Sequence, residues 1–158
     1  MLFAIIPLSA LLCNLFELPA KMNLSKENYQ AIQGVSSGLY WLIVFEIAAL
    51  IMIAILIMIE KKKKRTFKRL LVALICFVIS LALFFIFTLP ANITTNSWTV
   101  FPTGWETLRL QWEYSNAIRA IISFTGFSFI VLALLKNRNY YRVYEWACFF
   151  CSRDLHVG

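Results

Sequence analysis

The sequence predicts an all-α integral membrane protein folded as an antiparallel four-helix bundle. Of its 158 residues, 61% are hydrophobic and 15% are charged, a balance outside the range of soluble globular domains. The apolar residues gather in four long stretches, and a helix needs about 20 residues to cross a bilayer. A cationic run, Lys61 to Arg65, lies between the second and third stretches. Because such a run cannot enter hydrocarbon, it fixes that loop at one membrane surface.

Four spans are expected within a membrane domain that covers residues 1–135. Their approximate limits are residues 1–18, 39–59, 70–89 and 114–135. The first stretch lacks the cationic start of a signal peptide, so we interpret it as a span that ends near Pro19. Residues 20–34 are polar, and Ser25 is placed to begin a short surface helix there. The third span is expected to end at Pro90, before a polar connection over residues 91–112.

The fifteen Lys and Arg residues predict the orientation. Seven lie within residues 61–69, and four lie in a basic tail at 136–158. Since cytoplasmic segments carry an excess of these residues, we expect both segments on the cytoplasmic side of the cytoplasmic membrane. Because the number of spans is even, both termini are then expected on that side. The net charge of +7 would otherwise suggest nucleic acid, but the basic run lacks interleaved aromatic residues. The expected partner is therefore the lipid bilayer, and no nucleic-acid partner is expected.

Ionisable residues inside the spans are the candidates for a site, because they are costly to bury in a membrane. Glu46 lies about seven residues below the outer end of the second span, roughly 10 Å deep, and Arg119 lies at a similar depth in the fourth. An ion pair between them would remove most of that cost. Glu17 in the first span and Asn116 in the fourth are expected to join them in a pocket that opens outward. Such a set either holds helices together or forms a site for a ligand.

The fourth span also predicts a polar stripe, because polar residues recur there every three or four positions. The stripe comprises Arg109, Trp112 or Glu113, Asn116, Arg119 or Ala120, and Ser123. Elsewhere, Cys148, Cys151 and His156 provide three soft metal ligands, whereas a structural zinc site normally needs four. We therefore expect no metal and no cofactor.

Two segments of the chain form a recognisable pattern. The first is Glu17-Leu18-Pro19-Ala20-Lys21-Met22, with Tyr29 and Gln33 downstream. The second is Trp98, then Trp105-Glu106-Thr107-Leu108-Arg109, Trp112-Glu113 and Arg119. In these segments the chain resembles a bacterial family of small four-helix membrane proteins, grouped with fungal anthrone oxygenases that convert a polyketide anthrone to an anthraquinone without a known cofactor.

The resemblance implies site positions, and one of them departs from the family pattern. The implied positions are Trp105, Arg109, Trp112, Glu113 and Arg119. Many family members carry His where this chain has Asn116. Because an amide does not titrate, general acid–base chemistry is in doubt at this position.

Two functions follow from these observations. The first is a structural or ligand-binding membrane protein that takes a small lipophilic molecule into the outward-facing polar pocket. The alternative is a cofactor-free oxygenase of anthrone-like aromatic substrates, which needs an apolar cavity and a base such as Glu46 or Glu17. A transporter is disfavoured for a monomer, because the four spans show neither inverted repeats nor broken helices. The oligomeric state and the catalytic residues, if the protein is an enzyme, are not determined by the sequence.

Overall fold

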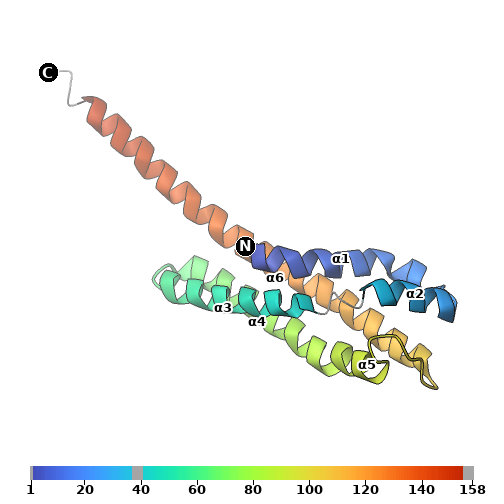
Figure 1. Cartoon of the computed structure of the whole chain (residues 1–158). Coiled ribbons are helices and arrows are strands. Elements are labelled where there is room, and N and C mark those ends of the chain that lie inside the picture. Colours follow the sequence, from blue (N-terminus) through green and yellow to red (C-terminus); the bar gives the residue numbers. More distant parts are fainter. Residues whose placement is uncertain (1, 37–40, 155–158) are drawn as a thin grey trace.

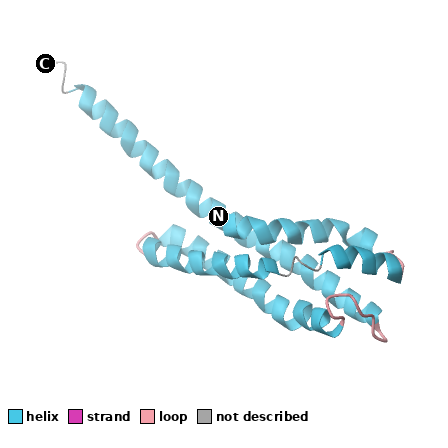
Figure 2. Ribbon diagram, viewed as in Figure 1, coloured by secondary structure: helices cyan, strands magenta, loops and turns pink. Residues whose placement is uncertain are grey.

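The structure, a computed structural model, describes the backbone of residues 2–36 and 41–154 and the side chains of residues 3–34 and 41–135. The described elements are helical throughout (Figures 1 and 2): α1 Leu2–Met22, α2 Lys26–Ser36, α3 Ile43–Glu60, α4 Lys64–Leu83, the π-helical turn η2 Phe84–Thr88, α5 Leu89–Thr94 and α6 Trp105–Asp154.

Within the described residues, four helical segments are long and apolar enough to span a membrane. They are Phe3–Met22, Ile43–Glu60, Lys64–Thr94 and Trp105–Leu135. Consecutive spans run in opposite directions and pack together (Figure 1), which confirms the all-α antiparallel bundle and makes the chain a multi-pass membrane protein.

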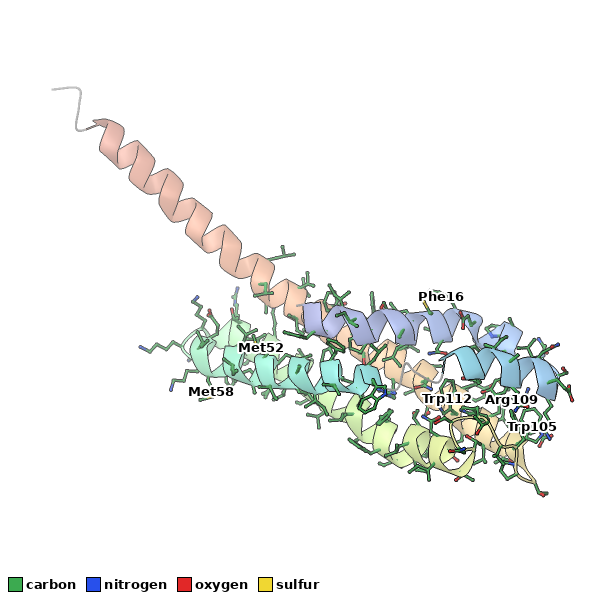
Figure 3. All side chains as sticks on the ribbon, in the orientation of Figure 1. Phe16, Met52, Met58, Trp105, Arg109 and Trp112 are labelled. Atoms are coloured by element: carbon green, nitrogen blue, oxygen red, sulfur yellow. The ribbon has the colours of Figure 1, made fainter. Side chains whose placement is uncertain are left out.

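The bundle presents apolar side chains on its outside as well as its inside. Phe16, Met52 and Met58 are exposed on its outer surface (Figure 3), as are many Ile, Val and Phe side chains of the spans. In water such a surface would be a liability, but in a bilayer it is the face that contacts lipid.

Small residues let the helices pack closely at the centre of the bundle. Ala4, Ala49 and Ala73 are buried there around Phe77. At Gly126, an added Cβ would lie 2.9 Å from the Cβ of Cys76 and 3.1 Å from the Phe77 ring. Small side chains let helices approach closely, which replaces the hydrophobic driving force that lipid does not supply.

The first helix continues past the position where the sequence predicted its end. Helix α1 includes both Pro7 and Pro19 and ends at Met22. Pro19 lacks only one backbone donor, and the turn that follows it is stabilised by side chains. Asn23 Nδ2 donates to the Pro19 carbonyl at 2.9 Å, and Lys21 pairs with Glu17 at 2.9 Å. The expected boundary near Pro19 is therefore wrong by one helical turn.

The third span also continues past its proline. The π-helical turn η2 precedes Pro90, and the Leu89 N–H donates to the Phe84 carbonyl. Pro90 occupies the first turn of α5, where its missing N–H costs little. Gln111 of α6 donates to the Phe87 carbonyl at 3.1 Å, which satisfies an acceptor of the irregular turn. The predicted end at Pro90 is wrong, because the π-helical turn absorbs the irregularity.

The connection to the last helix is shorter than predicted. It covers residues 95–104, since α5 ends at Thr94 and α6 begins at Trp105. Gly104 has a φ of +80°, a conformation that glycine adopts at no steric cost. The short surface helix expected near Ser25 is confirmed as α2, which begins at Lys26.

Helix α6 extends well beyond the bundle (Figure 1). It contains 50 residues, so its backbone continues as a helix through most of the segment predicted as a basic tail. The side chains of residues 136–158 lie outside the described part of the structure, and with them Cys148, Cys151 and His156.

Candidate functional site

The predicted ion pair between the second and fourth spans is confirmed. Arg119 Nη2 of α6 donates to Glu46 Oε2 of α3 at 2.7 Å, with 6% and 1% of the two side chains exposed. Both charges lie within candidate membrane spans. A pair this close and this well shielded from lipid removes most of the cost of placing either charge in hydrocarbon.

The guanidinium of Arg119 is held on three further sides. Its Nη1 donates to Asn116 Oδ1 at 3.0 Å, and its Nε donates to the Ser80 carbonyl of α4 at 3.1 Å. Its Cζ lies 4.9 Å from the centre of the Phe84 ring, a cation–π contact. Since the Ser123 hydroxyl also donates to Ser80 at 3.0 Å, the α4–α6 interface fixes this side chain in one position.

A cavity of about 90 Å³ lies beside the ion pair and is partly open to its surroundings. Glu46, Asn116 and Arg119 line it, together with Asn14 of α1 and Gln33 of α2. Three of the four residues that the sequence predicted to meet in a pocket therefore line this cavity. The fourth, Glu17, does not line the cavity: its side chain is 57% exposed and pairs with Lys21.

Two tryptophans form another wall of this cavity. Trp112 comes from α6, and Trp98 comes from the connection between α5 and α6. The indole rings contact each other edge to face, with centroids 6.0 Å apart. Trp98 is 2% exposed, so the connection between α5 and α6 covers this side of the cavity.

The backbone around Trp98 is strained. Asn96, Ser97 and Trp98 have φ angles of 45°, 55° and 66°, which cost non-glycine residues about 1–2 kcal/mol each. Hydrogen bonds hold the turn: the Ser97 N–H donates to the Asn92 carbonyl at 2.7 Å, and the Trp98 N–H donates to Thr95 Oγ1 at 3.1 Å. A strained turn that is held so firmly fixes the position of the Trp98 indole.

A second buried polar group, which we call the α2 cluster, adjoins the cavity; it consists of Lys21, Tyr29, Gln33, Arg109 and Glu113. Tyr29 donates to Glu113 Oε1 at 3.0 Å, and Gln33 Nε2 lies 3.0 Å from the Tyr29 hydroxyl and 3.3 Å from the same carboxylate oxygen. Burial, and then the charge of Glu113, raise the pKa of Tyr29 well above its ordinary value of 10.0. Because Gln33 also lines the cavity, the α2 cluster and the cavity share a wall.

The buried Lys21 was not among the predicted site residues, and neither were Asn14, Gln33 and Trp98, which line the cavity. Lys21 is 3% exposed, and its Nζ donates to Asn14 at 2.7 Å and to Glu17 at 2.9 Å. Its position followed from a helix that continues past Pro19, which the sequence did not predict. The i, i+4 spacing from Glu17 was the available signal.

Three residues of the predicted site lie in or beside the α2 cluster and do not line the cavity: Trp105, Arg109 and Glu113. Arg109 stacks on Trp105 at 4.8 Å and on Tyr29 at 5.5 Å, and it donates to the Leu24 carbonyl at 3.2 Å. Glu113 accepts the hydrogen bonds of α2. Figure 3 shows Trp105, Arg109 and Trp112 together at the end of the bundle that carries α2. Trp105, Arg109 and Glu113 attach α2 to α6 through their contacts with Tyr29.

Three buried polar atoms on cavity-lining side chains have no hydrogen-bond partner within the described part of the chain. They are Glu46 Oε1, Trp98 Nε1 and Trp112 Nε1. Buried polar groups in folded proteins are nearly always paired with protein atoms or ordered water. One acceptor and two donors thus remain to be satisfied around one cavity.

Comparison with known proteins adds no relationship, because no family model, no curated protein and no solved structure matches the chain.

Proposed function

We propose that this membrane protein binds the polar head of a small lipophilic molecule in the cavity beside the Glu46–Arg119 ion pair. The observation that carries the proposal is the set of three unpaired polar atoms on side chains that line a partly open cavity within the bundle. Each unpaired buried group costs about 1–3 kcal/mol, and a polar head in the cavity is placed to satisfy these three together.

The size of the cavity decides how much of the ligand it holds. An apolar cavity of about 150 Å³ accommodates a benzene molecule, and this cavity has about 90 Å³. The cavity therefore takes a head group and a few carbon atoms, while the remainder of the molecule extends through the open side.

The proposal includes an orientation in which the cavity lies toward the outer face of the membrane. Support comes from the cations of Lys61–Arg69, which lie at the opposite end of the bundle from α2 (Figure 1). The positive-inside bias favours the cytoplasm for that end, and with it both termini. A cysteine introduced at the exposed Lys62, in a variant whose four native cysteines are replaced by serine, tests this by its reaction with a membrane-impermeant maleimide. Labelling in intact cells, before the membrane is opened, would contradict the orientation.

Filling the cavity tests the binding proposal. Ala10 of α1 lines it, so Ala10→Phe should displace the head group. Ala20 lies on the same helix and is exposed, so Ala20→Phe is the matched control. After incubation with a membrane lipid extract and repurification, wild type and Ala20→Phe should retain a common lipophile by mass spectrometry, and Ala10→Phe should lose it. Equal retention by both variants would refute the proposal.

A second candidate is the cofactor-free oxidation of an anthrone, in keeping with the resemblance of two segments to anthrone oxygenases. The unpaired Glu46 Oε1 at the cavity favours it, because a carboxylate there is placed to accept a proton from the substrate CH₂ group. Dioxygen would then convert that CH₂ to a carbonyl and release water. The 90 Å³ cavity is too small for three fused rings, so this candidate also requires the helices to open.

Anthrone consumption under oxygen distinguishes the two functions. Oxidation above the uncatalysed rate that is lost in Glu46→Gln would establish the enzyme. A background rate with wild type would leave ligand binding as the function.

A further inference from the structure

We infer that the ligand head is uncharged and carries a hydroxyl group, so that the molecule is a neutral alcohol with an apolar tail. This inference rests on the proposed function, and it names the class of molecule that the cavity selects. Three features carry it: the balance of charges around the cavity, the pattern of unpaired donors and acceptors, and the volume.

The charges around the cavity already compensate one another. Glu46 pairs with Arg119 at 2.7 Å, and these are the charged side chains that line the cavity in the described structure. In the adjoining α2 cluster, Lys21 pairs with Glu17, and Arg109 and Glu113 both contact Tyr29. An ammonium or a carboxylate added here would be a buried charge without a counter-ion, which is far more costly than a neutral group.

The unpaired atoms specify what a neutral head must offer. Glu46 Oε1 is an acceptor that requires a donor, whereas Trp98 Nε1 and Trp112 Nε1 are donors that require an acceptor. Ethers, esters and ketones satisfy the indoles but leave the carboxylate oxygen unpaired. A hydroxyl group donates once and accepts up to twice, so it matches both kinds of atom.

Size favours a hydroxyl over larger groups that both donate and accept. The cavity of about 90 Å³ is smaller than the roughly 150 Å³ that accommodates benzene. A hydroxyl is the smallest organic group with both functions, and it leaves room for the first carbons of the tail.

Four ten-carbon probes test the head group: decan-1-ol, decyl methyl ether, decylammonium and decanoate. The protein in detergent micelles carries 5-fluorotryptophan, and the ¹⁹F resonances of Trp98 and Trp112 are assigned through Trp98→Phe and Trp112→Phe. Binding is measured as the mole fraction of probe in the micelle that half-saturates the shift, which corrects for partitioning. Ala10→Phe serves as the blocked cavity, and Ala20→Phe as its control.

The alcohol should give a saturable shift at both tryptophans that is present in Ala20→Phe and absent in Ala10→Phe. The ether should need about a tenfold higher mole fraction, because it leaves a buried acceptor unpaired. Decylammonium and decanoate should give no saturable shift. In Glu46→Gln the amide donates as well as accepts, so the ratio between ether and alcohol should fall toward one, provided that the circular dichroism spectrum is unchanged.

The possible failures are distinct. Saturable binding of the ether at the same mole fraction as the alcohol, or tighter binding of either ion, would overturn the neutral-hydroxyl inference. If Ala10→Phe still abolished that binding, the cavity would remain a ligand site. If none of the four probes produced a saturable, Ala10→Phe-sensitive shift, both the inference and the proposed function would be overturned.

Discussion

Replacing Arg119 by Gln should destabilise the protein strongly, because it leaves the charge of Glu46 without its partner inside the bundle. The Glu46 side chain is 1% exposed, and the 2.7 Å bond to Arg119 engages its Oε2. Removing one member of such a pair costs about 3–5 kcal/mol. Arg119→Gln also gives up hydrogen bonds to Asn116 and to the Ser80 carbonyl, so a loss in the upper half of that range is expected.

The double substitution Glu46→Gln with Arg119→Gln isolates the pair. Two amides carry no charge and still hydrogen-bond, so the double variant should be more stable than Arg119→Gln alone. The expected coupling between the sites is at least about 2 kcal/mol, well above the 0.3–0.5 kcal/mol deviation seen for independent sites.

Stability in the assay is the free energy of unfolding in mixed micelles, followed by circular dichroism for wild type, both single variants and the double variant. Glu106→Gln is the control, since Glu106 is exposed in the first turn of the same helix. It should change stability by less than about 0.5 kcal/mol. If the two single effects simply add, the ion pair does not hold α3 against α6 and the reasoning is refuted.

Three further predictions concern packing, ionisation and attachment of α2. Gly126→Ala should lower the free energy of unfolding by about 1–3 kcal/mol, because the added methyl group overpacks against α4. Gly34→Ala, where nothing lies within 4 Å of the added Cβ, should be neutral or slightly stabilising. Equal losses of stability at both sites would contradict the close approach at Gly126. The raised pKa of Tyr29 means that its stabilising contribution is complete below the unfolded pKa of about 10 and is lost as the pH rises above it. Absorbance at 295 nm should therefore reveal one late-titrating tyrosine that is missing in Tyr29→Phe, and identical titrations would exclude its burial. Lys21→Met should loosen α2 by removing the positive charge that acts on Glu113, the acceptor for Tyr29 and Gln33 of α2. Faster amide hydrogen exchange in residues 26–36 would show this, and unchanged exchange there would remove Lys21 from that role.

The sequence alone was sufficient to predict the features that depend on how each residue partitions between water and hydrocarbon. Four apolar stretches and a cationic loop predict membrane spans because hydrocarbon excludes unpaired backbone and charge. The same cost argument predicts that Glu46 and Arg119 find each other, and the structure places them 2.7 Å apart.

Features that depend on several segments at once required the tertiary structure. Pro19 and Pro90 signal helix ends by their local chemistry, but Asn23 and a π-helical turn compensate for them. A lysine is expected at the surface from its residue type, and Lys21 is buried beside Asn14 only because α1 continues past Pro19.

The membrane location, the number of spans and the central ion pair were thus determined by the sequence, because they depend on the cost of moving each group from water into hydrocarbon. The cavity, its unpaired atoms and the strained turn of Trp98 were decided by the tertiary structure. They depend on where α1, α2, α3, η2, α5, α6 and the loop of Trp98 converge, and no local pattern of residues encodes that convergence.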